Sequence, residues 1–246
     1  MPSSTNEVEH LARIAADSRY AQGVNFQMIE YTFRVFARHI RGTSILELGP
    51  AEGVMTNLLA PLARELMLVD GSERFCEDLR RRFPKAKVVQ SLFEDFQTSE
   101  RFDNIVLGHV LEHVNDPVEI LRVAKAALKP GGRILGAVPN ARSLHRQAAV
   151  MMGLIPHEET LNEADRHHGH RRVFTPEIFR RAFLEAGLRI EIFGGYWMKP
   201  VSNRQIEETW TPQMLQAFME LGERYPDIAG EIYVVARHSS ERIGND

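Results

Sequence analysis

Two carboxylates and a glycine-marked turn are the residues in the first half of the chain whose types and spacing favour ligand chemistry. Gly49, Ala51 and Gly53 follow one another as G-x-A-x-G at the end of an apolar run that also carries Glu47. Asp70 ends the next apolar run. A glycine in such a turn lets a ligand approach the backbone closely. A carboxylate at the place of Asp70 can accept hydrogen bonds from both hydroxyls of a ribose.

The turn is poorly suited to a diphosphate. Pro50 has no backbone N–H to offer a phosphate oxygen, and Ala51 stands where a glycine would let a phosphate approach. Glu47 would repel phosphates and favour a cation. We therefore expect an adenosine ligand that has free ribose hydroxyls, no diphosphate and a positive charge. S-adenosylmethionine, which has a sulfonium and an ammonium group, fits this description.

Short apolar strands that alternate with amphipathic helices must position these residues. Strands are expected at 44–48, 66–70, 87–90, 103–107, 133–138, 188–193 and 231–236. Helices are expected at 52–63, 73–83 and 117–128, and after Thr175-Pro176 and Thr211-Pro212, with two more before residue 42. The alternation predicts right-handed crossovers and a parallel sheet that is covered by helices on both faces.

Four segments in order resemble the successive motifs of class I S-adenosylmethionine-dependent methyltransferases. They read ILELGPAEG, LVDGS, FDNIVLGHVLEHVNDP and LKPGGRILGAVPN. They are especially similar to the small-molecule branch that includes the ubiquinone-pathway O-methyltransferases, and the resemblance covers roughly residues 30–238. It implies an α/β fold, a Rossmann-like three-layer αβα sandwich. Its seven-stranded sheet would be mostly parallel, with the last strand antiparallel beside the fifth.

The resemblance also implies a division of the chain. Residues 1–42 would form an N-terminal helical cap, and residues 43–238 the methyltransferase domain. Residues 139–174 would be a lid insertion after the fifth strand, with a short apolar helix around 148–154, and residues 239–246 a C-terminal tail.

Carried over residue by residue, the resemblance implies a set of cofactor-binding residues. The methionine side of S-adenosylmethionine would lie at the first turn, the ribose at the second strand, the adenine after the third, and one further contact after the fourth. In that order the residues are Glu47, Gly49, Ala51 and Gly53; Asp70, Gly71 and Ser72; Leu92 and Phe93; and His109. The acid that commonly meets the adenine amino group is absent from Gln90-Ser91-Leu92-Phe93, so Glu94 or Asp95 are candidates for a displaced substitute.

The histidine-rich run 167–172 has three interpretations: a solvated loop, a substrate contact that includes a general base, or a zinc site that no cysteine accompanies. Imidazole can act as a base near neutral pH. We take His170 as the first candidate base and His145 as the second. A phenol or carboxylate acceptor would need little help from a base because it is acidic, whereas an aliphatic hydroxyl would need more.

A second histidine pattern raises the question of a metal. His109 and His113 are four residues apart with Glu112 between them, which would place both rings on one helix face. In some ubiquinone-pathway relatives, acids in this segment bind a divalent ion, and His109 occupies the place of one of them. We expect no metal, and expect Glu112 and His113 to make local structural contacts.

Composition limits the possible partners and location. The net charge is −3, so no overall basic field points to nucleic acid or an anionic membrane. No apolar run approaches the roughly 20 residues that cross a bilayer, and Cys76 is the single cysteine. We expect a cytoplasmic protein with neither nucleic acid nor membrane as a partner. A homodimer through the apolar segment near Met151 and Met152 is possible.

The expected function is therefore transfer of a methyl group from S-adenosylmethionine to an oxygen or nitrogen of a small-molecule acceptor, with S-adenosylhomocysteine as the product. Two alternatives stay open. One is a protein or RNA methyltransferase, and the other is a non-catalytic module that binds the cofactor for a regulatory purpose.

Overall fold

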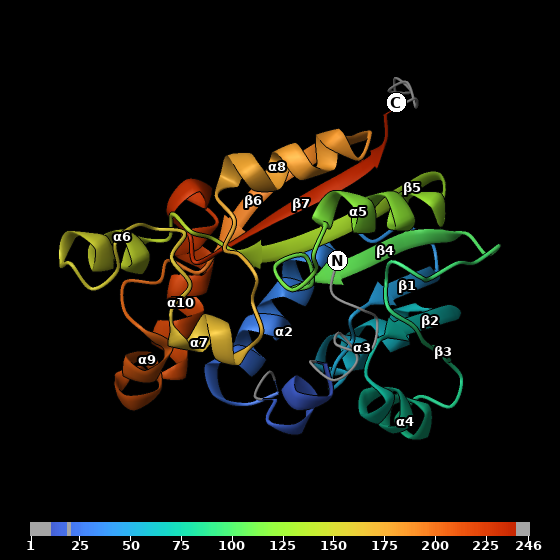
Figure 1. The fold of residues 1–246 in the computed structure, drawn as a ribbon, viewed down its shortest axis with the longest axis horizontal. Helices are drawn as coiled ribbons and strands as arrows, with labels where there is room; N and C mark the ends of the chain where they lie inside the picture. Colours follow the sequence, from blue (N-terminus) through green and yellow to red (C-terminus); the bar gives the residue numbers. More distant parts are fainter. Residues whose placement is uncertain (1–10, 19–20, 240–246) are drawn as a thin grey trace.

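The computed structural model of this chain describes residues 11–18 and 21–239, and Figure 1 shows its fold. A seven-stranded sheet has the order β3-β2-β1-β4-β5-β7-β6. The first five strands are parallel, and β7 is antiparallel to both β5 and β6. The strands are β1 (Ser44–Leu48), β2 (Glu65–Asp70), β3 (Lys87–Gln90), β4 (Phe102–Gly108), β5 (Leu128–Pro139), β6 (Leu188–Tyr196) and β7 (Glu231–His238). The expected sheet, with its last strand antiparallel beside the fifth, is confirmed.

Helices cover both faces of the sheet and complete three layers (Figure 1). One face packs against α5 (Pro117–Ala126) and α8 (Pro176–Glu185). The other packs against α2 (Gly23–Ala37), α3 (Val54–Leu59) and α10 (Pro212–Gly222). The expected three-layer arrangement is therefore confirmed.

The strands are buried on both sides, as a sheet between two helical layers requires. In β1 the side chains of Leu46 and Leu48 belong to the core under α5 and α8, whereas Ile45 belongs to the core under α2 and α3. All three are at most 1% exposed. The alternation explains why the strands read as continuous apolar runs.

The expected helix starts after strand five are confirmed by their caps. Thr175 accepts a hydrogen bond from the backbone N–H of Ile178 at the start of α8, and Thr211 does the same for Met214 at the start of α10. A proline occupies the first turn of each helix. The remaining long helix, α4 (Glu73–Arg82), is capped by Ser72.

Two helices differ from their expected bounds. The helix expected at 52–63 ends at Leu59 and continues as a 3₁₀ turn at Ala60–Leu62, because Pro61 cannot donate the α-helical hydrogen bond. The apolar helix expected at 148–154 is α6 (Leu144–Met151), which starts earlier and lies at one end of the molecule in Figure 1.

Two short helices, α7 (Glu163–His167) and α9 (Asn203–Thr209), were not expected. Both begin with a capping box, in which the N-cap side chain and the third helical residue bond each other's backbone. At five and seven residues, neither is long enough to show a hydrophobic period.

The chain's ends limit what can be said of the predicted domains. Residues 11–16 are helical and precede α2, while the rest of the predicted cap before residue 11, and residues 19–20, lie outside the described residues. Most of the predicted tail lies outside them as well. The domain boundaries therefore stay predictions. Among the described residues, the helices are too short or too polar for any of them to cross a bilayer.

Candidate active site

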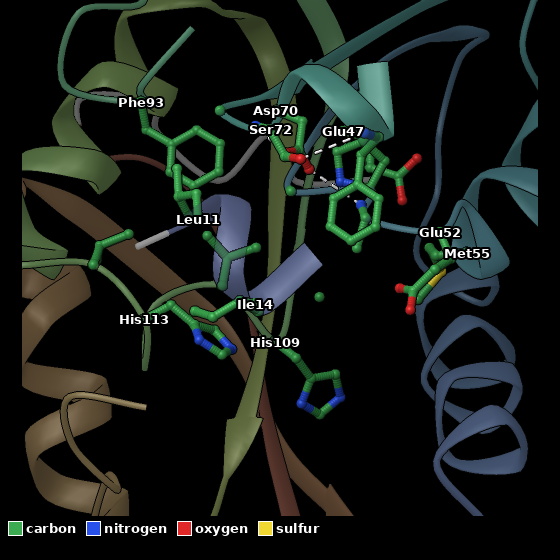
Figure 2. Close-up of a pocket in the computed structure, with 18 of the residues that line it drawn as sticks. Leu11, Ile14, Glu47, Glu52, Met55, Asp70, Ser72, Phe93, His109 and His113 are labelled. Atoms are coloured by element: carbon green, nitrogen blue, oxygen red, sulfur yellow. Dashed lines mark hydrogen bonds between the residues drawn. The ribbon is translucent and has the colours of Figure 1, made fainter. Parts of the chain in front are cut away.

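A pocket opens at the carboxyl ends of β1 to β4, where open α/β sheets bind their ligands. Its walls come from the turns after these strands, from α2, from residues 11 and 14 of the first helix, and from Gly169. Figure 2 shows Glu47, Asp70 and Ser72 on one side of this space and His109 and His113 on another. Nine of the ten expected cofactor residues line it: Glu47, Gly49, Ala51, Asp70, Gly71, Ser72, Leu92, Phe93 and His109.

The tenth expected residue, Gly53, does not line the pocket. It precedes α3 in the left-handed region, with φ 72°, and a Cβ there would lie 3.0 Å from Leu79 and 3.2 Å from Phe83. Gly53 thus allows α3 to start close to α4, and any role in cofactor binding stays a prediction.

The turn after β1 contains residues with left-handed backbone conformation, and a neighbouring side chain packs closely against it. Gly49 has φ 70°, and a Cβ on it would come within 2.8 Å of Val110. Ala51 has φ 46°, a conformation that costs an L-residue energy and favours glycine. This is the position at which the related motif usually has glycine, so the alanine adopts the turn at the expense of backbone strain.

Two of the carboxylates that line the pocket, those of Glu47 and Asp70, are buried. Asp70 accepts hydrogen bonds from the backbone N–H of Ser72 at 2.8 Å and of Ala51 at 3.2 Å, which ties the turns after β2 and β1 together. Glu47 accepts one from the Thr56 hydroxyl at 2.7 Å. Burial raises the pKa of Glu47 to about 8 and the pKa of Asp70 to about 6. Each carboxylate would therefore gain from a cationic or hydroxyl-bearing ligand that stabilises its charge.

The residues that follow β3 supply a further part of the pocket wall. Ser91, Leu92, Phe93 and Glu94 all line the pocket, whereas Asp95 does not. Of the two candidates for a displaced adenine-binding acid, Glu94 therefore has the better position.

His109 follows β4 with φ 59°, again in the left-handed region. Its Nδ1 lies 3.6 Å from the carboxylate of Glu112 and 3.6 Å from that of Glu231. Burial alone would lower the pKa of His109, but these two carboxylates raise it above the ordinary value. His109 is therefore a buried, acid-flanked imidazole on the pocket wall.

His170, the first candidate base, lies one ring behind the pocket wall. The wall itself is formed by His113, whose ring meets that of His170 edge-on with 4.8 Å between centroids. Nδ1 of His170 lies 3.3 Å from Asp165. Burial lowers the pKa of His113 to about 4, so this imidazole is neutral at neutral pH and only weakly basic.

His145, the second candidate base, is not among the residues that line the pocket. It lies in α6, where its backbone N–H donates to the carbonyl of Lys199 at 3.1 Å. Burial, with the charges of Lys199 and Arg146, lowers the pKa of its ring to about 2. The structure therefore does not bring the two candidate bases together.

The histidine-rich run is bonded to the segment after β4, although His167 is exposed to solvent. The backbone N–H of Arg171 donates to the carbonyl of Glu112 at 2.8 Å, and its Nε donates to the carbonyl of His113 at 2.6 Å. Arg172 donates to the carbonyl of Val114 at 2.7 Å. Bonds between segments so far apart in the chain leave no mark in the sequence, and the wall role of His113 was missed for this reason.

The described residues contain one grouping with the composition of a metal site. Glu112, His113 and His170 bring possible ligand atoms within 4.8 Å of one another, and His109, which the sequence pairs with His113, is not part of the group. The expected absence of a metal stays a prediction.

Comparisons with known proteins place this geometry in a family. A family model described as a methyltransferase domain matches residues 19–191. The chain is 28% identical over 171 residues to a ubiquinone biosynthesis O-methyltransferase of Methylobacterium sp. (strain 4-46), with 67% of each chain covered.

Two solved structures share the fold. One, from Haloferax volcanii, is a complex between the Trm112 methyltransferase activator and a methyltransferase (TM-score 0.64, 18% identity, 92% of this chain and 96% of that chain covered). The other is the N-methyltransferase NodS from Bradyrhizobium japonicum WM9 in complex with S-adenosylhomocysteine (TM-score 0.62, 17% identity, 95% and 98% covered).

Proposed function

We propose a small-molecule acceptor for this chain, which belongs to the methyltransferase domain family and takes its methyl group from S-adenosylmethionine. The acceptor atom would be an oxygen or a nitrogen. The observation that carries the proposal is the pocket itself. Its two buried carboxylates face a space whose other walls are mostly apolar, and Leu11 and Ile14 of the first helix cover it (Figure 2).

The residues of the pocket fit the cofactor. The buried carboxylates of Glu47 and Asp70 are disfavoured as anions in the ligand-free protein, and a cation or a pair of hydroxyls would restore their charge. We assign Asp70 to the ribose hydroxyls and Glu47 to the positively charged methionine side. Gly49 lets Val110 approach the turn after β1 more closely than a side chain at this position would allow.

When bound, S-adenosylmethionine supplies a methyl group on a sulfonium that is already a good leaving group. The work of the protein is then to orient the acceptor and exclude water. The apolar side chains of Leu11, Ile14 and Met28 would do the latter. They would also suit an apolar or aromatic acceptor.

An acceptor that is only weakly acidic would need a base near the pocket to take up its proton. His113 joins His170 as a candidate, because His113 lines the pocket and His170 contacts its ring from behind. His145 is the less favoured candidate because its ring lies away from the pocket. A phenol would suit this arrangement, and the similarity to ubiquinone biosynthesis O-methyltransferases supports that class of acceptor.

A macromolecular acceptor is the second candidate, since one structural neighbour is a methyltransferase in complex with the activator Trm112. The net charge of −3 argues against RNA, because a phosphate backbone needs a basic surface.

The test is a transfer assay with methyl-labelled S-adenosylmethionine and panels of phenols, amines and carboxylates, with bulk tRNA and cell-extract protein as further acceptors. We expect label in a small molecule, and we expect His113→Ala to reduce its formation. His157→Ala, a change at an exposed histidine, is the matched control. Label found solely in RNA or protein would overturn the proposal.

A further inference from the structure

A pair of buried hydroxyls lies against the ring of His109. Thr32 in α2 and Tyr196 at the end of β6 are both 0% exposed, and their oxygens are 2.6 Å apart. Nε2 of His109 is 3.3 Å from the Thr32 hydroxyl and 3.4 Å from the Tyr196 hydroxyl. Residues from three distant parts of the chain thus meet at one imidazole nitrogen.

The directions of the hydrogen bonds in this group follow from counting protons. Thr32 has one hydroxyl proton, and it donates this proton to the carbonyl of Met28 at 2.9 Å. Thr32 is then an acceptor toward Tyr196, so the phenol proton of Tyr196 points at Thr32. Neither hydroxyl has a proton left for His109. With the hydroxyl protons assigned in this way, Nε2 faces two acceptor oxygens and would carry the hydrogen of the ring.

The other side of the ring is also surrounded by acceptors. Nδ1 of His109 faces the carboxylates of Glu112 and Glu231, each at 3.6 Å. Both ring nitrogens of His109 thus face possible acceptors inside the protein.

We propose that Thr32 and Tyr196 are positioning residues that hold His109 with its hydrogen on Nε2, as a fixed part of the pocket wall rather than as the base of the reaction. The hydroxyl of Thr32 also holds the carbonyl of Met28, and Met28 lines the pocket from α2. The Thr32 hydroxyl would thus position two residues of the pocket wall, His109 after β4 and Met28 on α2. The inference rests on the proposed cofactor site.

A variant series separates this role from a general effect on stability. Thr32→Val keeps the shape of the side chain but removes the hydroxyl, and Thr32→Ser keeps the hydroxyl. Thr209→Val is the matched control, because Thr209 makes the same bond to the carbonyl four residues earlier but lies exposed in α9. Tyr196→Phe tests the second hydroxyl.

Two measurements are made on each protein: the dissociation constant for S-adenosylhomocysteine by calorimetry, and the ring nitrogen signals of ¹⁵N-histidine-labelled protein, with His109 assigned by its absence from His109→Gln. We expect wild-type His109 to show a hydrogen bonded to Nε2. Thr32→Val should weaken binding roughly tenfold, as for a lost buried hydrogen bond, while Thr32→Ser and Thr209→Val bind like wild type.

Each contrary outcome has one meaning. A wild-type His109 that carries no hydrogen on Nε2 overturns the inference, and this result needs no variant to fold. Unchanged binding by both Thr32→Val and Tyr196→Phe overturns it as well. If the wild-type protein itself fails to bind S-adenosylhomocysteine, the proposed cofactor site fails instead.

Discussion

At the scale of single residues, we propose that Glu47 and Asp70 select the ligand. Both are carboxylates at the ends of neighbouring strands, and both are buried, at 2% and 7% exposure. A buried carboxylate without a cationic partner loses hydration and becomes easier to protonate. The charged forms of these two side chains are disfavoured in the ligand-free pocket. A ligand with a positive charge and free hydroxyls would stabilise them and would therefore bind more tightly.

Replacing Asp70 tests the ribose assignment. Asp70→Ala should weaken the binding of S-adenosylhomocysteine by about 1–3 kcal/mol, the range for loss of hydrogen bonds to a charged group. Calorimetry measures the difference, and Asp95→Ala, at an exposed acid outside the pocket, should bind normally. An unchanged dissociation constant for Asp70→Ala would contradict the assignment.

Replacing Glu47 tests its burial through the pH dependence of stability. Folding raises the pKa of Glu47 from 4.5 to about 8. The protonated form is therefore favoured in the folded protein, and its contribution to stability is present below the unfolded pKa and lost as the pH rises through the folded one.

Between about pH 5 and pH 8, the ligand-free wild type should lose unfolding free energy that Glu47→Gln, which cannot ionise, retains. Urea denaturation at both pH values measures this, with Glu65→Gln at an exposed position as the control. Parallel pH profiles for wild type and Glu47→Gln would contradict the raised pKa.

At the scale of elements, α2 is the piece whose position the site depends on most. It carries Met28 on the pocket wall and Thr32 beside His109. Its N-cap residue, Gln22, makes no side-chain cap. The carboxylate of Glu207 in α9 instead accepts a hydrogen bond from the backbone N–H of Val24 at 2.9 Å. A distant helix thus supplies the cap that the local sequence lacks.

Removing this cap should loosen α2. Glu207→Ala should lower the free energy of unfolding by about 0.5–2 kcal/mol, as for other lost N-caps, and should speed amide exchange in the first turn of α2. Urea denaturation and hydrogen exchange measure the two effects. Glu208→Ala, at the exposed neighbour that pairs with Arg204, is the control. Equal losses in both variants would show that Glu207 does not cap α2.

The elements show where sequence patterns suffice. Apolar runs and Thr-Pro helix starts predicted every strand, and each helix of ten or more residues, in the α/β part of the chain. They could do so because hydrophobic periodicity and helix caps depend only on residues that are close together in the sequence. They did not predict α7 or α9, which are too short for a period. They also placed one unbroken helix at 52–63, where Pro61 ends the α-helical hydrogen bonding.

At the scale of the whole molecule, the pocket should distinguish two adenosine ligands by charge. In the turn after β1, Pro50 has no backbone N–H to donate to a phosphate oxygen, and the buried carboxylates of Glu47 and Asp70 lie nearby. A diphosphate would therefore be repelled by these carboxylates and would lack a hydrogen-bond donor. A ligand that binds the folded state raises the free energy of unfolding, and the increase depends on the ratio of the ligand concentration to the dissociation constant.

S-adenosylhomocysteine at about 100 times its dissociation constant should therefore raise the unfolding free energy by about 2.7 kcal/mol. NAD at the same concentration should leave the thermal midpoint unchanged. Differential scanning calorimetry measures both effects. Stabilisation by NAD but not by S-adenosylhomocysteine would contradict the assignment of S-adenosylmethionine to this pocket.

By itself, the sequence determined the order of strands and helices and the ligand-facing turns. Gly49, Asp70 and their neighbours follow directly from strand ends, and the ends of parallel strands meet at one edge of a sheet. Tertiary structure alone decided that His113 lines the pocket and that His170 lies behind it. His113 and His170 come together because the run after residue 165 bonds to the segment after β4, and Thr32 meets His109 because α2 packs on the sheet. Such contacts join residues far apart in the chain, and no local period or motif encodes them.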